Sequence, residues 1–356
     1  MPNHPTLDVN LSAIAANYRL LKARHAKGTL AAVVKADAYG LGMSAVAARL
    51  WDEGCRDFFV ATLAEGVSLR AVLPEANIGV FNGLLAGEEK EFQRHTLMPV
   101  LNDLGQVERF QGSGFRIQDS GIIHVDTGMT RLGLSIVDLK KISFRILNPE
   151  SRILLMSHLA CASDPAHPKN AEQLTRFREA LKYFPGAKAS LANSSGIFLS
   201  PDFHFDLARP GCALYGINPT KGENPMQPVA TLSAPILQIR TLDHDEAIGY
   251  DATYAAPKGS RIAVIGIGYA DGWMRALSNK GSAYIAGYKV PVIGIISMDM
   301  LALDVTNIPE AKLTSDVRAE FINAQHTVDD VARDCNTIGY EIFTRIGNRV
   351  ARNYID

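Results

Sequence analysis

Short apolar runs alternate with longer amphipathic stretches over the first two-thirds of the chain. Each run has the length of one buried strand, and the stretches between them repeat apolar residues every three or four positions, as one helical face does. In the first stretch Leu11, Ile14 and Tyr18 share such a face, and Ser12 is a candidate N-cap. We expect strands at Leu30–Val34, Phe58–Ala61, Ile78–Phe81, Leu97–Leu101, Ile122–Val125, Ile153–Met156, Lys188–Ala192 and Phe205–Ala208, and helices that include Ser12–His25, Met43–Glu53, Leu63–Val72, Ser135–Ile146 and Asn170–Tyr183.

Eight strands that alternate with helices predict a parallel (β/α)8 barrel over residues 1–228. The alternative is a doubly wound open sheet. A dinucleotide-binding sheet of that kind has a GxGxxG motif after its first strand, and none follows Leu30–Val34. The barrel is therefore the favoured fold.

The hydrophobic pattern changes around Asn218–Pro228, where several prolines and a glycine indicate a linker. We expect a second, mainly β domain over residues 229–356, and the first few residues of the chain are candidates to pair with it. Ala286-Gly287 fits a hairpin turn, and helical periodicity returns only at Thr327–Cys335. The expected strands include Ile236–Ile239, Arg261–Ile267, Ala283–Ile285, Val290–Ile296 and Leu301–Val305.

Composition narrows the function classes. The 356 residues are 47% hydrophobic and carry a formal net charge of −1, so no electrostatic footprint for nucleic acid is present. No secretory signal and no apolar stretch of about 20 residues is seen, so we expect a cytoplasmic protein that does not bind a membrane. The four cysteines are scattered and the nine histidines show no metal-ligand spacing, so we expect reduced thiols and no metal site.

Polar side chains gather at the carboxyl ends of the expected strands. In a (β/α)8 barrel these ends meet on the face that carries the active site. Several of the residues are cationic or become so on protonation, which indicates an anion site, and we expect the anion to be a phosphate. The residues are Lys35, Asn102, Arg131, His158, Asn193, Ser194 and Arg209.

Lys35 directly follows the apolar run Ala31–Val34. A lysine held at a strand end in a low-dielectric site often has a lowered pKa and acts as a nucleophile or base, although a solitary lysine there more often reaches out to solvent. The segments Asn193–Gly196 and Arg209–Cys212 follow strands seven and eight, whose loops commonly bind phosphate in barrels. A strand-end lysine and a phosphate site in one barrel mouth indicate pyridoxal phosphate.

Eight sequence blocks, in order and spread over nearly the whole chain, resemble those of the alanine racemase family. The first, Val34–Gly40, is similar to that family's pyridoxal-lysine signature. The others are Asp126–Gly133, Ser157–Ala160, Asn193–Gly196, Arg209–Gly211, Gly249–Tyr254, Gly268–Gly272 and Ser297–Asp299.

The resemblance implies a racemase that interconverts L-alanine and D-alanine on pyridoxal phosphate, with D-alanine supplied for peptidoglycan. Lys35 would hold the cofactor as a Schiff base and serve as one catalytic base, and Tyr250 would be the second base, acting on the opposite face of the substrate Cα. Arg209 would face the pyridine nitrogen and, because guanidinium keeps its proton, would leave that nitrogen unprotonated. A cation at His158 or Arg209 would help to tune Tyr250.

The family resemblance also implies the remaining site residues. Cofactor contacts are expected from Tyr39, His158, Asn193, Ser194, Gly211 and Cys212, the last two through backbone N–H groups. Arg131 and the backbone of Met298 would bind the substrate carboxylate, Asp299 would lie beside them, and Tyr269 and Arg275 would line the entrance. In this family the β domain of one subunit completes the barrel mouth of the other, so a homodimer with shared active sites is expected.

Two positions depart from the family pattern. His124 stands where many relatives have a lysine that can be carbamylated to support the arginine at the position of Arg131. Another group, such as chloride or a neighbouring carboxylate, must then position Arg131. Asn348 stands where some relatives have a tyrosine, and the smaller side chain makes acceptance of serine or a larger amino acid plausible.

Three alternatives to a strict alanine racemase remain open. One is a broad-specificity racemase. Another is a related pyridoxal barrel enzyme, either a decarboxylase, against which Arg209 argues, or an aldolase, which would need a metal site. The third is a non-catalytic pyridoxal-phosphate-binding protein, which would ordinarily lack residues 229–356.

Overall fold

A computed structural model describes residues 3–25, 28–114, 121–146, 153–314 and 316–356. The chain forms two compact units. Ile14–Gln227 form one, called here the barrel unit, and Met1–Ala13 together with Pro228–Asp356 form the other, called here the β unit. Across the described residues, each helix is too short or too polar to traverse a lipid bilayer.

The barrel unit is built on a curled parallel sheet that closes on itself. Seven strands pair in chain order from β3 to β9. The first and last strands also pair with each other. Leu207 of β10 lies opposite Thr29 of β2, and the Val33 N–H of β3 donates to the Pro210 carbonyl just after β10. An isolated bridge between Asn193 and Arg209 joins that last strand to β9. The strands are β2 (Thr29–Leu30), β3 (Ala32–Val33), β4 (Asp57–Val60), β5 (Asn77–Val80), β6 (Met98–Leu101), β7 (Ile122–His124), β8 (Leu154–Met156), β9 (Lys188–Ser190) and β10 (Leu207–Ala208).

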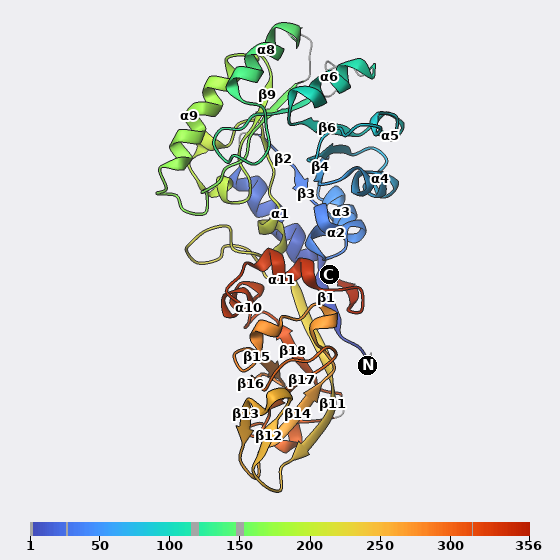
Figure 1. Ribbon diagram of the computed structural model, residues 1–356, viewed down its shortest axis with the longest axis vertical. Coiled ribbons are helices and arrows are strands. Elements are labelled where there is room, and N and C mark those ends of the chain that lie inside the picture. The colour runs from blue at the N-terminus through green and yellow to red at the C-terminus, as the bar shows by residue number, and fades with distance from the viewer. Residues whose placement is uncertain (1–2, 26–27, 115–120, 147–152, 315) are drawn as a thin grey trace. The chain divides into compact units, whose positions relative to one another are not determined.

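The expected (β/α)8 barrel is thus confirmed, with β2 and β3 forming its first strand in two pieces. Helices surround the parallel strands (Figure 1). The side chain of Asn10 caps the first helix by accepting from the Ala13 N–H at 2.7 Å, so the Ser12 cap was wrong. The helices are α1 (Leu11–Arg24), α3 (Met43–Asp52), α4 (Leu63–Val72), α5 (Glu89–Arg94), α6 (Leu104–Gly112), α8 (Ile136–Ile146) and α9 (Lys169–Leu181).

The β unit contains a closed barrel of antiparallel strands. Strand β11 pairs with both β14 and β18, and the ring continues through β17, β16 and β15. Near the N-terminus, β1 (Thr6–Asn10) pairs with β11 and with the last strand, β19 (Ala351–Ile355). The other strands are β11 (Ala230–Thr241), β14 (Arg261–Ile265), β15 (Ser282–Ile285), β16 (Tyr288–Ile293), β17 (Leu301–Asp304) and β18 (Arg318–Ile322).

The mainly β fold expected for the C-terminal part is therefore confirmed. The hairpin turn at Ala286-Gly287 joins β15 to β16 with both residues at positive φ, the conformation of a tight two-residue hairpin. The ring of Trp273 packs edge-on against Phe321 in the core, with centroids 5.0 Å apart. The remaining elements are the short strands β12 (Glu246–Ile248) and β13 (Tyr254–Ala256) and the helices α10 (Val328–Asp334) and α11 (Gly339–Arg345).

A buried histidine is expected to make the barrel unit sensitive to acid. His25 is 1% exposed, both of its ring nitrogens lack a hydrogen-bond partner among the residues that the structure describes, and its ring lies 5.0 Å from that of His204. The pKa of His25 is lowered to about 4, mainly by burial and in part by the neighbouring His204, while Asp206 opposes the shift. His25 of the unfolded chain therefore binds a proton below about pH 6.5, whereas His25 of the folded chain binds one only below about pH 4. Between these two pH values protonation favours the unfolded chain.

We predict that His25→Phe removes part of the acid sensitivity. The wild type should lose up to about 3 kcal/mol of stability from this group as the pH falls from 6.5 to 4, because one pKa unit corresponds to about 1.4 kcal/mol. Urea unfolding at pH 7 and pH 4.5 measures the effect, and the variant corrects for all other titrating groups. Equal losses in the two proteins would contradict the prediction.

Candidate active site

Lys35 opens a turn of left-handed backbone at the carboxyl end of β3. This turn, α2 (Lys35–Tyr39), has φ values of 52° to 58° at Ala36, Asp37, Ala38 and Tyr39. For residues with a side chain this conformation costs roughly 1–2 kcal/mol each, so surrounding contacts must hold it. Backbone strain of this kind tends to occur at functional sites.

Two carboxylates hold the strained turn. Oε1 of Glu65 accepts from the Ala36 N–H at 2.8 Å, and Oδ1 of Asp37 accepts from the Met43 N–H at 2.7 Å. Gly40 ends the turn at a φ of 83°, which glycine adopts without strain. The turn therefore fixes the direction in which the chain leaves Lys35.

The amino group of Lys35 has the properties of a nucleophile or base. Burial lowers its pKa, the nearby Arg131 guanidinium lowers it further, and Glu65 partly opposes these effects. Its Nζ lies 5.9 Å from the centroid of the Phe81 ring. A lowered pKa increases the fraction of neutral amine near pH 7, which is the form that attacks a carbonyl or takes a proton.

Arg209 is a buried cation at the end of β10. The residue is 2% exposed, Nη2 donates to the Ser157 carbonyl at 2.5 Å, and Nη1 donates to Oγ of Ser190. Its Nε is buried and has no partner among the described residues. Burial lowers the pKa of Arg209 to about 9, which leaves the guanidinium charged at neutral pH. The site thus contains a charged N–H donor that is free to bind an acceptor.

His158 lies beside Asn193, with Nε2 and Nδ2 3.3 Å apart. Burial and the charge of Arg209 hold the pKa of His158 well below its ordinary value. The imidazole of His158 is therefore neutral at pH 7. Of the two groups expected to tune Tyr250 by their charge, His158 and Arg209, only Arg209 is charged.

A small cradle lies where β9 and β10 end. Oγ of Ser194 accepts from the backbone N–H groups of Gly211 and Ala213 at 2.9 and 3.2 Å. A Cβ at Gly211 would lie 2.4 Å from Oη of Tyr39, so only glycine permits this approach. Burial raises the pKa of Tyr39, which keeps its hydroxyl protonated and able to donate. Cys212 begins the following 3-10 turn, Cys212–Tyr215.

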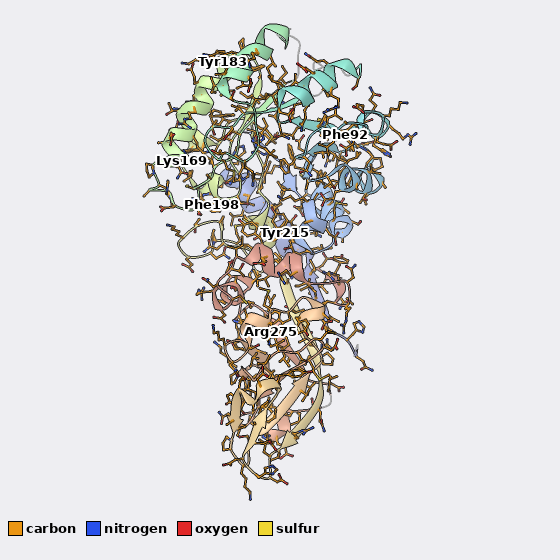
Figure 2. The ribbon with its side chains drawn as sticks, in the orientation of Figure 1. Phe92, Lys169, Tyr183, Phe198, Tyr215 and Arg275 are labelled. Carbon is orange, nitrogen blue, oxygen red and sulfur yellow. The ribbon has the colours of Figure 1, made fainter. Side chains whose placement is uncertain are left out.

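The aromatic floor of this cradle joins it to the Lys35 turn. The rings of Tyr39 and Tyr215 have centroids 4.8 Å apart. Tyr215, labelled in Figure 2, donates its hydroxyl to the Val33 carbonyl at 2.8 Å. The strand that precedes Lys35 and the turn that forms the cradle are therefore fixed to each other.

His124 is the last residue of β7, and Arg131 lies in the loop that follows this strand. Nδ1 of His124 donates to Oδ1 of Asn102 at 2.8 Å, since that amide oxygen can only accept. Burial, then the charges of Arg209 and Arg131, lower the pKa of His124 to about 4, so it is neutral. The loop that carries Arg131 is shaped by Asp126, whose Oδ1 accepts from the N–H groups of Gly128, Met129 and Thr130.

The remaining candidate residues belong to the β unit. Tyr250 begins the turn Tyr250–Ala252 and is 68% exposed, and Met298 is 53% exposed. Both line a groove of about 630 Å³ together with apolar side chains such as Ile248 and Met300. Tyr269 begins the turn Tyr269–Asp271 and donates its N–H to the Ser297 carbonyl at 3.1 Å. Arg275 begins a further turn, Arg275–Leu277, and is labelled in Figure 2.

The structure thus gathers the predicted residues into two groups. Lys35, Tyr39, His158, Asn193, Ser194, Arg209, Gly211 and Cys212 lie at the carboxyl end of the parallel barrel, and Tyr250, Tyr269 and Met298 lie in the β unit. Glu65 was not predicted as a site residue, and Asp126 was named only as the first residue of a family block. Glu65 had a signal, because Thr62 and Glu65 have the spacing of a capping box, which the structure contains.

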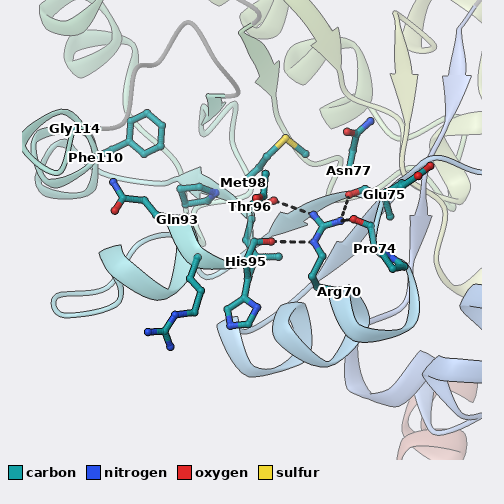
Figure 3. Close-up of a pocket in the computed structure, with 14 residues that line it drawn as sticks. Arg70, Pro74, Glu75, Asn77, Gln93, His95, Thr96, Met98, Phe110 and Gly114 are labelled. Carbon is teal, nitrogen blue, oxygen red and sulfur yellow. Dashed lines mark hydrogen bonds between the residues drawn. The ribbon is translucent and has the colours of Figure 1, made fainter.

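A second pocket, of about 550 Å³, lies at the amino-terminal ends of β5 and β6 (Figure 3). Arg70 crosses it, and its guanidinium donates to the carbonyls of Leu73, Pro74, Ala76, His95 and Thr96. Arg70 therefore links the loop before β5 to the loop before β6, and its three guanidinium nitrogens all donate to backbone carbonyls. The pocket therefore lies at the end of the barrel opposite to the carboxyl strand ends that carry Lys35 and Arg209. The residues described contain no cluster of three or more His, Cys, Asp or Glu able to hold a metal ion.

Comparisons with known proteins cover nearly the whole chain. Residues 9–219 match the family model "Alanine racemase, N-terminal domain", and residues 229–354 match "Alanine racemase, C-terminal domain". An alanine racemase from Acidiphilium cryptum is 47% identical over 98% of both chains, and one from Rhodospirillum rubrum is 45% identical over 98% of this chain and 95% of its own. The crystal structure of alanine racemase from Bartonella henselae with covalently bound pyridoxal phosphate has a TM-score of 0.92 and 40% identity, over 99% of this chain and 100% of that chain.

Proposed function

This chain belongs to the alanine racemase family, and from that premise we propose that it interconverts L-alanine and D-alanine with Lys35 and Tyr250 as its two catalytic bases. The observation that carries the proposal is the arrangement at the barrel mouth. A lysine with a lowered pKa begins a strained turn that is joined to the cradle around Ser194. We further propose that the product D-alanine is used for peptidoglycan.

The barrel mouth fits pyridoxal phosphate. Lys35 would hold the cofactor covalently, and the donors around Ser194, Gly211, Cys212 and Tyr39 would hold its phosphate. The unpartnered Nε of Arg209 suits the pyridine nitrogen, because it is a buried, charged donor with no acceptor among the described residues. When bound, the cofactor withdraws electrons from the substrate Cα and so makes its proton removable.

Lys35 and Tyr250 would then move the proton. Inversion at Cα requires one group to take a proton from one face and another to return a proton on the opposite face. The Lys35 amine suits this task because its lowered pKa increases the fraction of neutral amine that can take a proton. Arg209 would keep its own proton and so leave the pyridine nitrogen unprotonated. An unprotonated ring withdraws less charge from Cα, which favours return of a proton to Cα over side reactions.

Arg131 and Met298 would orient the substrate by its carboxylate, Arg131 through its guanidinium and Met298 through its backbone N–H. The loop built around Asp126 supports this role for Arg131, because three backbone donors fix the chain that carries it. His124 is neutral and engaged with Asn102, so in this chain the loop carries out the support that a carbamylated lysine supplies elsewhere in the family.

We propose that the protein works as a homodimer in which the partner subunit's β unit completes each site. Support comes from Tyr250 and Met298, two residues needed for chemistry that are more than half exposed beside an apolar groove. Exposed apolar grooves of this kind commonly mark interfaces. Tyr269 and Arg275 would line the entrance of the completed site.

Chiral chromatography tests the proposed reaction. The purified protein, supplied with pyridoxal phosphate, should convert either enantiomer of alanine to an equal mixture. A protein that binds the cofactor but leaves both enantiomers unchanged would be a non-catalytic pyridoxal-phosphate-binding protein, and the proposal would fail.

Asn348 supports a second candidate, a broader amino-acid specificity. Its side chain is small and exposed, at the position where some relatives have a tyrosine. We predict that Asn348→Tyr raises the ratio of kcat/KM for alanine over serine by about tenfold, because a larger side chain leaves less room for the serine hydroxymethyl group. Steady-state kinetics with both amino acids provide the measurement, and an unchanged ratio would exclude this role for Asn348.

A further inference from the structure

Arg349 joins two carboxylates that come from distant parts of the β unit. Its Nε lies 3.1 Å from Oδ1 of Asp271, and its Nη1 lies 2.8 Å from Oδ1 of Asp299. Asp271 belongs to the turn that begins at Tyr269, and Asp299 directly follows Met298. One guanidinium therefore connects the segment of Tyr269, proposed to line the entrance, with the segment of Met298, proposed to bind the substrate carboxylate.

Backbone contacts already bring these two segments together. Tyr269 donates its N–H to the Ser297 carbonyl at 3.1 Å, and Ala270 donates to the Met298 carbonyl at 2.9 Å. A Cβ at Gly268 would lie 2.3 Å from the Met298 carbonyl oxygen, so the two backbones are in direct contact. A displacement of either segment would thus move the other.

The chain around Arg349 is fixed to the same turn. The Gly347 N–H donates to the Asp271 carbonyl at 2.9 Å. A Cβ at Gly272, where φ is 96°, would lie 1.9 Å from the Arg345 carbonyl oxygen. Arg349 thus approaches Asp271 from a segment whose own position is set by two close backbone contacts.

Asp271 needs a cationic partner more than Asp299 does. Its side chain is 2% exposed, whereas that of Asp299 is 50% exposed. Oδ2 of Asp271 accepts from the Gly268 N–H at 2.8 Å, and Oδ1 faces Arg349. Loss of the guanidinium would leave a buried carboxylate without its charge partner, which forces that carboxylate or its turn to move. The hydrogen bond to Asp299 and the charge of Asp271 raise the pKa of Arg349, so its guanidinium keeps its charge.

We propose that Arg349 is a positioning residue for the substrate carboxylate. It acts through Asp271 and Asp299, which hold the Tyr269 turn against Ser297–Met300 and so fix the Met298 backbone N–H. The proposal rests on the carboxylate-binding role of Met298 in the proposed function. It predicts that Arg349 serves binding of the carboxylate rather than the transfer of the proton.

Arg349→Met tests this. In the variant the KM for L-alanine should rise about tenfold or more, while kcat stays within about threefold, because ground-state and transition-state binding are weakened alike. The dissociation constant of propionate, which keeps the carboxylate and lacks the amino group, should rise in parallel. Propionate binding is followed by the absorbance of the bound cofactor and needs no turnover. Arg349→Lys should restore most of the loss, since an ammonium reaches one of the two carboxylates.

Arg345→Met is the matched control. Arg345 and Arg349 have equally exposed side chains, at 54%, and Arg345 pairs only with Glu341 of its own helix among the ion pairs found in the described residues. The Arg345→Met variant should have the same KM for L-alanine and the same dissociation constant for propionate as the wild type. If Arg349→Met folds poorly, Asp299→Asn breaks only the exposed half of the connection and should raise both constants in the same direction by a smaller factor.

Unchanged KM and propionate binding in Arg349→Met, or equal losses in Arg345→Met, would overturn the proposal. A wild type that binds propionate but does not racemise alanine would instead contradict the proposed function. The propionate measurement would still decide the role of Arg349 in that case.

Discussion

Lys35→Ala is expected to lower the rate of alanine racemisation by at least about 10³-fold. The variant loses a base that would act on Cα and the amine that would hold the cofactor covalently. The lowered pKa of Lys35 and the strained turn from Ala36 to Tyr39 indicate that the fold maintains this amine for chemistry at an energetic cost. Chiral chromatography measures the loss of activity.

Borohydride reduction separates the two roles of Lys35. In the wild type, reduction followed by peptide mapping should place the cofactor on Lys35, and in Lys35→Ala no stable attachment should form. Lys289→Ala, which removes an exposed lysine on β16, should behave as the wild type. Attachment of the cofactor to another lysine, with activity retained in Lys35→Ala, would disprove the assignment.

Tyr250→Phe is expected to lower racemisation by about 10²–10⁴-fold, the range for removal of a general acid or base. The loss should be unequal for the two half-reactions, because Lys35 remains on one face of the substrate. In D2O, one enantiomer of alanine should therefore still exchange its α-hydrogen for deuterium, while the other should not.

Mass spectrometry of each recovered enantiomer measures that exchange. Tyr288→Phe is the matched control, since Tyr288 is a partly exposed tyrosine of the same unit, at 40% exposure. Exchange from both enantiomers at wild-type rates in Tyr250→Phe would show that another group returns the proton.

The strands of the parallel barrel were predictable because burial on both faces makes each strand a continuous apolar run. Helix Leu63–Val72 was predicted to the residue, and the structure adds a capping box at Thr62 that had not been used in the prediction. Helices α5 and α6 were not singled out. Glu89–Arg94 is only six residues long and charged, so it offers too few positions for a period to be recognised.

Other features depend on contacts between residues far apart in the chain. Strand β19 pairs with β1, placing Ala351 opposite Thr6, and no local pattern encodes such a partnership. The left-handed turn after Lys35 contains alanine and tyrosine, which do not favour positive φ, and Glu65 helps to hold it from another helix. The neutral state of His158 likewise follows from its burial near Arg209, which only the folded barrel creates.

The candidate site was predictable as far as its residues share one sheet edge. Lys35, His158, Asn193 and Arg209 each follow a strand, and parallel strands bring those ends together. A neighbouring carboxylate was expected as one way to position Arg131, but Asp126 was not named for that role, in which it accepts from three backbone groups of its own loop. The Asp271–Arg349–Asp299 connection was also missed, since its members are separated by long stretches of chain.

The shared active site is tested most directly by mixing two inactive variants. Lys35→Ala and Tyr250→Phe are combined in equal amounts, unfolded and refolded together with pyridoxal phosphate. Half of the dimers then contain one chain of each kind, and half of the sites in those dimers hold an intact Lys35 and an intact Tyr250. We predict recovery of about a quarter of the wild-type racemase activity. A mixture that stays as inactive as its two components, while refolded wild type regains activity, would contradict the account.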